Sequence, residues 1–291
     1  MSDEVLNQPP PLEGYDAFAA DPWLEAAIRR QGLDWVAGAA SELGKFVGSA
    51  EGRSHAAAAN RYVPELRTHD RFGHRIDAVE YHPSYHALMH RAISSGVHSL
   101  AWKRERGGFG ARATLFYLWN QLEQGIACPV TMTFASVPMF AHAPDIAATW
   151  RPKVVADAYD PRPAPIAGKA GATIGMAMTE KQAGSDLRAV VTQAHRDGGA
   201  FTLEGHKWFC SAPMSDAFFT LARLPEGVSC FFVPRSLPDG ERNPLQIQRL
   251  KDKCGNRSNA SAEIEYRGTL AWAVGAPGRG IATLIEMAHH T

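Results

Sequence analysis

Residues 160–171 read DPRPAPIAGKAG, and this stretch separates two parts of the sequence that differ in character. Proline lacks a backbone donor and glycine is flexible, so such a segment favours a connecting loop over a helix or strand. Before it, apolar residues recur at helical spacing, and after it short runs rich in β-branched and aromatic residues follow one another. The stretch therefore predicts a boundary near residue 170 between a helical domain and a β domain.

The part before this boundary, residues 1–170, is predicted to be an all-α domain. Asp21 suits the N-cap of a first helix and Pro22 its first position. Helical spacing of apolar residues predicts helices within residues 21–31, 34–50, 82–102, 111–125 and, interrupted or ended near Pro138, 129–140.

The part after it, residues 171–275, is predicted to be an antiparallel β-barrel or sandwich. Strand-like runs occupy residues 172–178, 189–196, 201–210, 217–224, 229–236, 245–250 and 262–266. The segment 196–200, RDGGA, is a hairpin-turn signal. Residues 276–291 predict the start of a C-terminal helical domain, and because the chain ends inside that helix we expect a fragment or a shortened product. The predicted fold class is α+β.

The composition argues against some classes of protein. The chain of 291 residues has 45% hydrophobic and 21% charged residues, as expected of an ordinary globular protein. Lys+Arg and Asp+Glu both number 30, and this zero net charge argues against bulk electrostatic binding of nucleic acid, while a local basic patch stays open. The cysteines form no CxxC pair, and neither a signal peptide nor an apolar run of about 18 residues is present. We expect a cytoplasmic protein without a membrane span.

The loop 176–187, MAMTEKQAGSDL, offers hydroxyls and backbone amides in a short space. Thr179 and Ser185 could bind carbonyl or phosphate oxygens, and Gly184 would let the backbone approach a ligand. Such residues are also common in solvated turns. Local composition alone favours the turn.

The segment 204–217, EGHKWFCSAPMSDA, predicts a strand that ends in a polar residue. Strand alternation places Phe209 and Ser211 on one face, and Trp208 and Cys210 on the other. A ring beside a hydroxyl could line a flat heteroaromatic ligand, and ordinary core packing is the alternative. The segment 250–266, LKDKCGNRSNASAEIEY, could bind an anion or serve as a loop into a strand, with about even weight on composition.

Two further patterns carry less weight. GKAGATIG, residues 168–175, follows a proline-rich loop and enters a strand, whereas a dinucleotide fingerprint follows a strand and opens a helix. His82, His86 and His90 lie at helical spacing, but no further zinc ligand is indicated, so a partly exposed helix face is the favoured interpretation.

Three segments in order resemble the acyl-CoA dehydrogenase superfamily. MTEKQAGSD (178–186) resembles the flavin loop TEPxAGSD, GHKWFCS (205–211) resembles the strand GxKxWIT, and 250–266 resembles KLGxRxSxTxxxxF. With CPVTMTFASVP (128–138), their spelling is closest to the AidB-type branch, flavin-containing proteins of the bacterial alkylation response. The resemblance covers nearly the whole chain, and Lys181 departs from it by replacing the proline of the loop.

This resemblance implies a helical domain, a β-barrel and a C-terminal helical bundle, with FAD between the barrel and the bundle. It implies that Thr179 meets the pyrimidine end of the flavin, that Ser185 lies near the pyrophosphate and the CoA arm, that Phe209 flanks the flavin and that Ser211 lies near N5. The full set of implied cofactor-binding positions is Met176, Met178, Thr179, Gly184, Ser185, Phe209, Cys210 and Ser211. Ser185, Arg257 and Ser261 are weaker candidates for substrate binding.

The implied reaction is α,β-dehydrogenation of an acyl thioester, such as an acyl-CoA, with a glutamate as the base. The family's alternative glutamate position aligns with Thr291, and Glu286 lies more than one turn earlier, so no catalytic residue is assigned. The other hypotheses are a non-enzymatic flavoprotein of the DNA alkylation response and an inactive truncated fragment. DNA contacts would come from the missing C-terminal domain, and the full-length family is expected to form tetramers.

Overall fold

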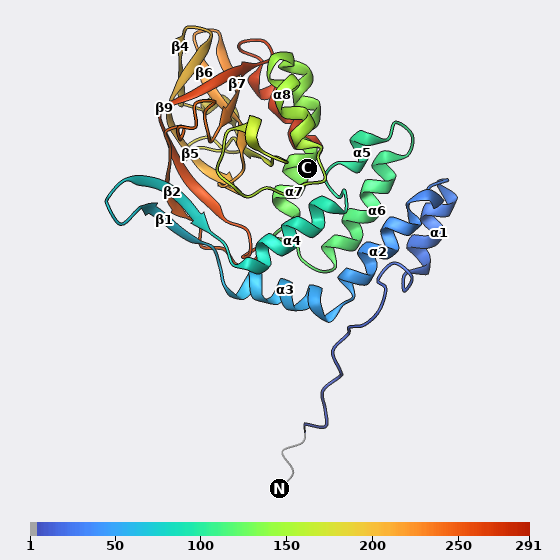
Figure 1. Ribbon diagram of the computed structural model, residues 1–291. Coiled ribbons are helices and arrows are strands. Elements are labelled where there is room, and N and C mark those ends of the chain that lie inside the picture. The colour runs from blue at the N-terminus through green and yellow to red at the C-terminus, as the bar shows by residue number, and fades with distance from the viewer. Residues whose placement is uncertain (1–4) are drawn as a thin grey trace.

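The helical half begins as its sequence predicts, with Asp21 Oδ1 accepting a hydrogen bond from Leu24 N at 2.9 Å and Pro22 in the first turn. A computed structural model describes residues 5–291 (Figure 1). The α-helices of this half are α1 (Pro22–Arg30), α2 (Ala37–Val47), α3 (Ala50–Arg61), α4 (Pro83–Ser94), α5 (Leu100–Lys103), α6 (Gly108–Asn120), α7 (Ala127–Ala135) and α8 (Pro144–Val154). Short 3-10 helices cover Asp34–Val36 and Val137–His142.

Several predicted helices are shorter than expected. The run 82–102 is split between α4 and α5, because Gly96 adopts φ +73°, outside the helical region. The run 111–125 ends at Asn120, before Gly125. Helices α3 and α8 were not predicted at all, since α3 is rich in alanine and polar residues and shows little apolar periodicity.

The prediction of a wholly helical first half missed one ribbon, made of β1 (Glu65–His69) and β2 (Arg75–Glu80) in an antiparallel pair. Its residues are mostly polar and partly exposed, so the sequence carries little strand signal. Buried Asp77 fastens the ribbon to the barrel, accepting hydrogen bonds from Arg75 Nε at 3.0 Å and Ile247 N at 2.9 Å, with Arg242 Nη1 at 2.9 Å.

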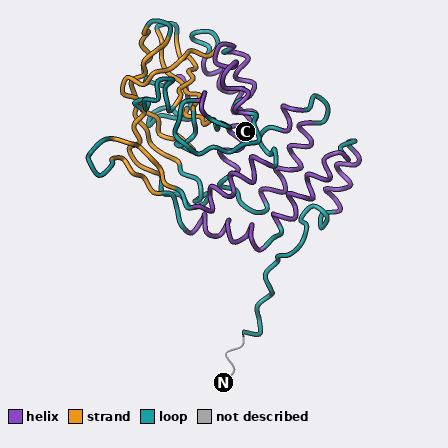
Figure 2. The backbone as a smooth tube through the Cα atoms, viewed as in Figure 1, coloured by secondary structure: helices purple, strands orange, loops and turns teal. Residues whose placement is uncertain are grey.

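The second half is a closed barrel, which with the helices confirms the α+β class (Figure 2). Its strands are β3 (Ile174–Ala177), β4 (Gln193–Asp197), β5 (Ala200–Ser211), β6 (Ala217–Leu224), β7 (Gly227–Pro234), β8 (Leu245–Leu250) and β9 (Ser261–Val274). The ring runs β6, β7, β9, β5, β4 and back to β6, with β8 added along β9. The predicted hairpin at 196–200 is confirmed, with Asp197 opposite Ala200.

One pairing departs from the antiparallel prediction and shapes the site. Strands β3 and β4 both run parallel to β6 and lie one after the other along the same edge of it, at Ile174–Ala177 and at Gln193. Strands β3 and β4 therefore occupy one continuous position beside β6. Residues 178–192 form a loop between them that leaves the barrel and returns to the same edge of β6, and we call this segment the excursion loop.

Helix α9 (Gly280–His289) lies where the sequence predicts a helix and packs on β6 and β7. Its entry needs glycine, because a Cβ at Gly280 would lie 2.2 Å from the Ser229 carbonyl carbon. Phe140, Phe232 and Leu284 belong to a shared apolar core between the helices and the outer face of the barrel. The two halves are therefore packed against one another, and the burial of each such side chain stabilises this contact by about 1.5–3 kcal/mol.

Candidate functional site

A buried carboxylate holds the excursion loop in place. Glu180 Oε1 lies 2.7 Å from Lys207 Nζ, and both side chains are fully buried. Glu180 also accepts hydrogen bonds from Thr192 Oγ1 at 2.6 Å and Val191 N at 2.7 Å. Burial alone would raise the pKa of Glu180, but the Lys207 ammonium and these hydrogen bonds outweigh it and lower the pKa to about 2. The loop is thus fixed from inside the barrel.

The outer side of the same loop keeps unused donors. Within residues 5–291, the hydroxyl and amide of Thr179 and the amides of Gly184 and Ser185 donate no hydrogen bond. Thr179 O accepts from Trp208 N at 2.7 Å, which ties the loop to β5. Gly184 and Ser185 are exposed, and a Cβ at Gly184 would meet only Thr179 Cγ2 at 3.4 Å, so glycine is not required there. A rigid loop with outward donors can hold an acceptor-rich ligand.

The end of β5 corrects the predicted alternation of faces. Against β9, Lys207 is opposite Ile264 and Cys210 is opposite Ala262, so β5 carries a bulge over Trp208 and Phe209. Lys251 Nζ lies 3.3 Å from the Trp208 ring centroid and 4.6 Å from that of Phe209. The two rings therefore lie beside the same cation, and the prediction that they point to opposite faces is wrong.

The bulge also decides which predicted positions are accessible. Cys210 is fully buried in the barrel interior, where burial raises the pKa of its thiol to about 12, so only its backbone can meet a ligand. Phe209 is 46% exposed. Other rings of this chain, such as Phe72 and Phe109, are exposed as well, and Phe209 differs from those two by lying beside the loop with unused donors. Met176 and Met178 are half-buried against the core shared by the two halves.

A small polar cluster lies at the ends of β5 and β9. Ser211 Oγ is 3.4 Å from Ser261 Oγ, and Lys253 Nζ is 3.4 Å from the same Ser261 oxygen. Asn259 is fully buried, and neither its amide oxygen nor its amide nitrogen has a partner among the described residues. Burial raises the pKa of the Cys128 thiol, opposed by the nearby Lys253 charge. The amide of Asn259 lies beside the Cys128 thiol and is fully enclosed, so a further partner would have to be a small molecule such as water.

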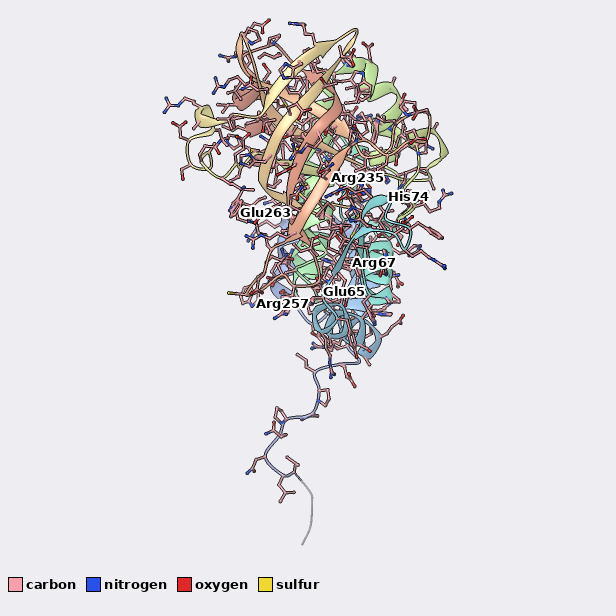
Figure 3. The ribbon with its side chains drawn as sticks, turned by 90° about the vertical axis from the view of Figure 1, so that its left-hand side faces the viewer. Glu65, Arg67, His74, Arg235, Arg257 and Glu263 are labelled. Carbon is pink, nitrogen blue, oxygen red and sulfur yellow. The ribbon has the colours of Figure 1, made fainter. Side chains whose placement is uncertain are left out.

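Arg257 lies apart from the excursion loop. It is exposed at the outer edge of the molecule, below Glu263 in Figure 3. It lines a pocket of about 90 Å³ together with Lys251, Lys253 and Asn259, and no residue of 176–187 lines that pocket. The structure thus gathers Thr179, Phe209, Ser211 and Ser261 around the end of β5. Arg257 lies farther out and shares a pocket with the lysines that border Phe209 and Ser261.

Sequence reasoning did not identify the residues that support the loop and the end of β5, namely Cys128, Glu180, Lys207, Lys251, Lys253 and Asn259. The sequence signals only one half of the buried ion pair, because Glu180 is the only carboxylate between Ile174 and Gly184, whereas Lys207 lies in a strand that also carries Glu204 and His206. The remaining residues gain their places only through the pairing of β5 with β9.

The other titratable candidates have local partners. His82 Nδ1 accepts from Ser84 N at 3.2 Å and so caps α4, while His90 is exposed. Glu286 Oε2 is 2.8 Å from His142 Nε2. Across residues 5–291, no group of three metal-ligating side chains comes together, and no helix has the length and apolar character to cross a bilayer.

Two family models match this chain. Residues 7–161 match the family described as the adaptive response protein AidB N-terminal domain, and residues 175–269 match the acyl-CoA dehydrogenase middle domain. The chain belongs to the AidB branch of the acyl-CoA dehydrogenase family. The AidB protein of Escherichia coli (strain K12) is 43% identical over 287 residues, which cover 97% of this chain and 53% of that protein.

Other proteins are also similar to this chain in sequence or in fold. Acyl-CoA dehydrogenase family member 11 of Caenorhabditis elegans is 28% identical over 78% of this chain and 39% of its own length. The structure of Bd2924 in its apo-form superposes with a TM-score of 0.85 at 27% identity, covering 94% of this chain and 57% of that one. C. elegans ACDH-11 in complex with C11-CoA has the same fold, with a TM-score of 0.86 at 24% identity over 100% of this chain and 52% of that one. This AidB-branch chain spans about half the length of E. coli AidB and of these two structures.

Proposed function

We propose that this chain supplies the helical and barrel parts of a FAD-binding, acyl-CoA dehydrogenase-like oxidoreductase. The observation that carries the proposal is the half-exposed Phe209 ring beside a loop with unused donors. A flavin combines a flat ring, which an exposed aromatic can stack against, with carbonyl and phosphate oxygens, which need donors. The residues on this side of the site fit those two requirements.

Each residue has a distinct part in this proposal. Phe209 stacks on the ring system, and Thr179 donates its hydroxyl and amide to the pyrimidine oxygens. The amides of Gly184 and Ser185, at the exposed end of the loop, bind the pyrophosphate. Ser211 provides a hydrogen bond near the centre of the ring. When bound, FAD supplies the hydride acceptor for α,β-oxidation of an acyl thioester.

Two charged groups adjust the same site. Lys251 lies against the Phe209 ring but is paired with Glu263 at 2.7 Å, whereas Lys253 lies beside Ser261, so Lys253 brings the positive charge to the region where a flavin gains electron density on reduction. Glu286 is engaged with His142, and we assign no proton-abstracting residue in this chain. The activity of the longer AidB-type protein, its acyl-CoA substrate and its tetrameric assembly are therefore part of the proposal.

Titration with FAD tests the cofactor proposal. We expect FAD fluorescence to change saturably on addition of the 291-residue chain, and Phe209→Ala to weaken binding about tenfold, or about 1.4 kcal/mol. Phe72→Ala is the matched control, because Phe72 is also an exposed ring, at 72%, and lies in the turn between β1 and β2. Absence of saturable binding, or equal losses in the two variants, would contradict the proposal.

The reaction class needs a separate experiment. Anaerobic addition of an acyl-CoA to a FAD-loaded, AidB-length protein should bleach the flavin absorbance if the protein is a dehydrogenase. DNA binding without bleaching would instead favour the non-enzymatic flavoprotein of the alkylation response.

A further inference from the structure

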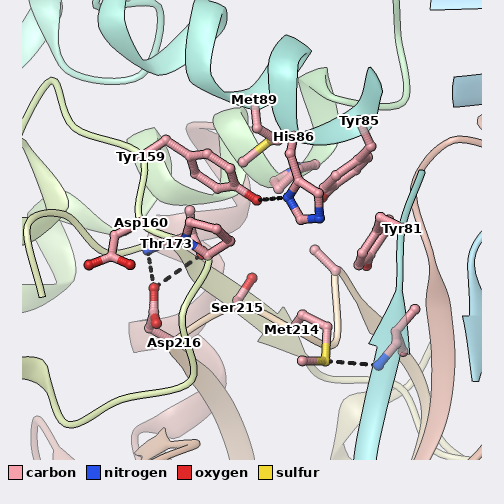
Figure 4. Close-up of a pocket in the computed structure, with 14 residues that line it drawn as sticks. Tyr81, Tyr85, His86, Met89, Tyr159, Asp160, Thr173, Met214, Ser215 and Asp216 are labelled. Atoms are coloured by element: carbon pink, nitrogen blue, oxygen red, sulfur yellow. Dashed lines mark hydrogen bonds between the residues drawn. The ribbon is translucent and has the colours of Figure 1, made fainter. Parts of the chain in front are cut away.

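A second pocket lies between the two halves, away from the excursion loop (Figure 4). It is formed by α4, by the segment after α8 and by the turn between β5 and β6. Its volume is about 60 Å³, and because a water needs about 10–15 Å³, it has room for about four to six small groups. No residue of the loop 176–187 lines it, so it is distinct from the proposed flavin surface.

Three polar side-chain atoms of residues that line this pocket have no protein partner among the described residues, namely Ser215 Oγ, His86 Nε2 and Tyr81 Oη. Ser215 is 3% exposed, and its Oγ makes no hydrogen bond among the described residues. His86 uses its Nδ1, which is 2.9 Å from Tyr159 Oη, and its Nε2 has no partner in the same part of the chain. Figure 4 shows His86 and Ser215 on opposite sides of the pocket. A buried hydroxyl without a partner costs about 1–3 kcal/mol, so this group is suited to a ligand.

The protonation states determine what the pocket offers. Burial raises the pKa of Tyr159, which keeps the phenol protonated, and burial lowers the pKa of His86, which keeps the imidazole neutral. Among the described residues, Tyr159 Oη has no hydrogen-bond acceptor other than His86 Nδ1, so we assign the phenol as the donor and place the imidazole proton on Nε2. The pocket therefore presents an N–H donor from His86 and an O–H donor from Ser215.

The charges around the pocket disfavour an anion. Asp216 is paired with Lys169 and Asp160 with Arg162, while the buried Arg235 guanidinium donates to the backbone carbonyls of Pro213 and Asp77, so the nearby cations are already engaged. A carboxylate in the pocket would lose its hydration without gaining a cation. A neutral carbonyl oxygen needs only the two donors. The rings of Tyr81 and Tyr85 and the side chains of Met89 and Met214 supply apolar surface for a short tail, and the Tyr81 hydroxyl is a further polar group without a partner among the described residues.

The backbone that presents Ser215 is held in a rare conformation. Ala212 adopts φ +49°, in the left-handed region that a residue with a Cβ seldom enters, and its carbonyl accepts from Ser215 N at 2.8 Å. Such strain persists where the surroundings over-determine a conformation, which occurs often at binding sites. His86 and Tyr159 are only half-buried, so a small ligand can reach the pocket from solvent.

We propose that this pocket binds a small neutral carbonyl compound, an amide, ketone or ester, whose oxygen accepts hydrogen bonds from His86 Nε2 and Ser215 Oγ. The ligand has about four to six non-hydrogen atoms. For so small a ligand the expected affinity is in the millimolar range. The pocket is a binding site separate from the proposed flavin chemistry and does not depend on it.

Titration of the 291-residue chain with 2-butanone and N-methylacetamide, followed by the imidazole nitrogen resonances of His86, tests this proposal. We expect a saturable shift of Nε2, and at least tenfold weaker binding in Ser215→Ala, which removes one donor and little volume. His90→Gln, on the exposed side of α4, should bind as the wild type does. Ser215→Cys, which keeps a weak donor, should fall between the two.

Three outcomes would overturn the proposal. One is the absence of a saturable shift, which would mean that the pocket holds buried water only. Another is equal or tighter binding of propionate, which would show that the site takes anions. The third is unchanged binding in Ser215→Ala when its thermal unfolding matches that of the wild type. Because FAD is absent from all these samples, failure here leaves the flavin proposal to its own test.

Discussion

Two buried carboxylates, Glu180 and Glu123, each hold one of the loops that frame the proposed flavin surface, and they do so differently. Glu180 faces a buried cation, Lys207, inside the barrel. Glu123 accepts hydrogen bonds from neutral donors, namely Ile126 N at 2.6 Å, Ser258 Oγ at 2.7 Å and Asn60 Nδ2 at 2.9 Å. Both side chains are almost completely buried.

The difference follows from where the partners lie. Glu180 and its partners all belong to the barrel, so this carboxylate fixes the excursion loop onto its own domain. Glu123 follows α6, Asn60 lies in α3 and Ser258 precedes β9, so this carboxylate joins the helical half to the barrel loop 251–260. The buried ion pair thus fixes the loop 178–192 within the barrel. Glu123, with its uncharged hydrogen-bond donors, joins the loop 251–260 to the helical half.

The largest expected effect is the loss of Glu180. Glu180→Ala leaves the Lys207 ammonium buried without a counter-charge, and we expect the free energy of unfolding to fall by about 3–5 kcal/mol. Urea denaturation measures this change. Glu265→Ala is the matched control, because its partner Arg267 is 60% exposed and an exposed pair contributes at most about 1 kcal/mol. Equal losses in the two variants would show that the buried pair does not organise the barrel.

A smaller effect is expected at Glu123. Glu123→Ala leaves the Ser258 hydroxyl and the Ile126 amide without their acceptor, so the free energy of unfolding should fall by about 1–3 kcal/mol. Hydrogen exchange should accelerate in 251–260 more than in 178–192, since only the first loop depends on this network. Equal acceleration in both loops would remove the distinction between them.

The pH dependence of the Glu180 contribution sharpens the same contrast. The folded pKa of Glu180, about 2, lies below its ordinary value of about 4.3, so the folded state binds fewer protons than the unfolded state near pH 3. The stabilisation is therefore complete above about pH 5 and is lost as the pH falls toward about 2. The difference in unfolding free energy between the wild type and Glu180→Gln should shrink over that window. A difference that stays constant between about pH 6 and pH 3 would contradict the charged pair.

The smallest effect on stability is expected at Phe209. Because the ring is 46% exposed, Phe209→Ala should change the free energy of unfolding by about 0.5 kcal/mol or less. Phe231→Ala, which empties a fully buried position in the same barrel, should cost about 3–5 kcal/mol. A large loss of stability in Phe209→Ala would mean that this ring belongs to the core and is not kept for a ligand.

Local signals in the sequence predicted the features that depend on neighbouring residues. The cap at Asp21, the turn at 196–200 and the helix near 280 each rest on a few adjacent residues, and the structure contains them all. The ribbon β1–β2 was not predicted, because its polar residues carry little strand preference and its stability comes from Asp77 contacts with the barrel.

The site was predictable only in part, for the same reason. The loop 176–187 and the strand with Phe209 and Ser211 stood out by their residues, but their relative placement depends on pairing between distant strands. The bulge in β5 arises from its register with β9, and the ion pair joins Glu180 to Lys207 across 27 positions. Neither can be deduced from alternation along one strand.

The most direct test of the central claim is a map of the amides that respond to FAD. Backbone amide spectra of the 291-residue chain should show saturable shifts at Thr179, Gly184, Ser185, Phe209 and Ser211, with little change in β1 and β2. Shifts confined to other surfaces, or no saturable shifts at all, would contradict the claim that the excursion loop and the end of β5 form one face of a flavin site.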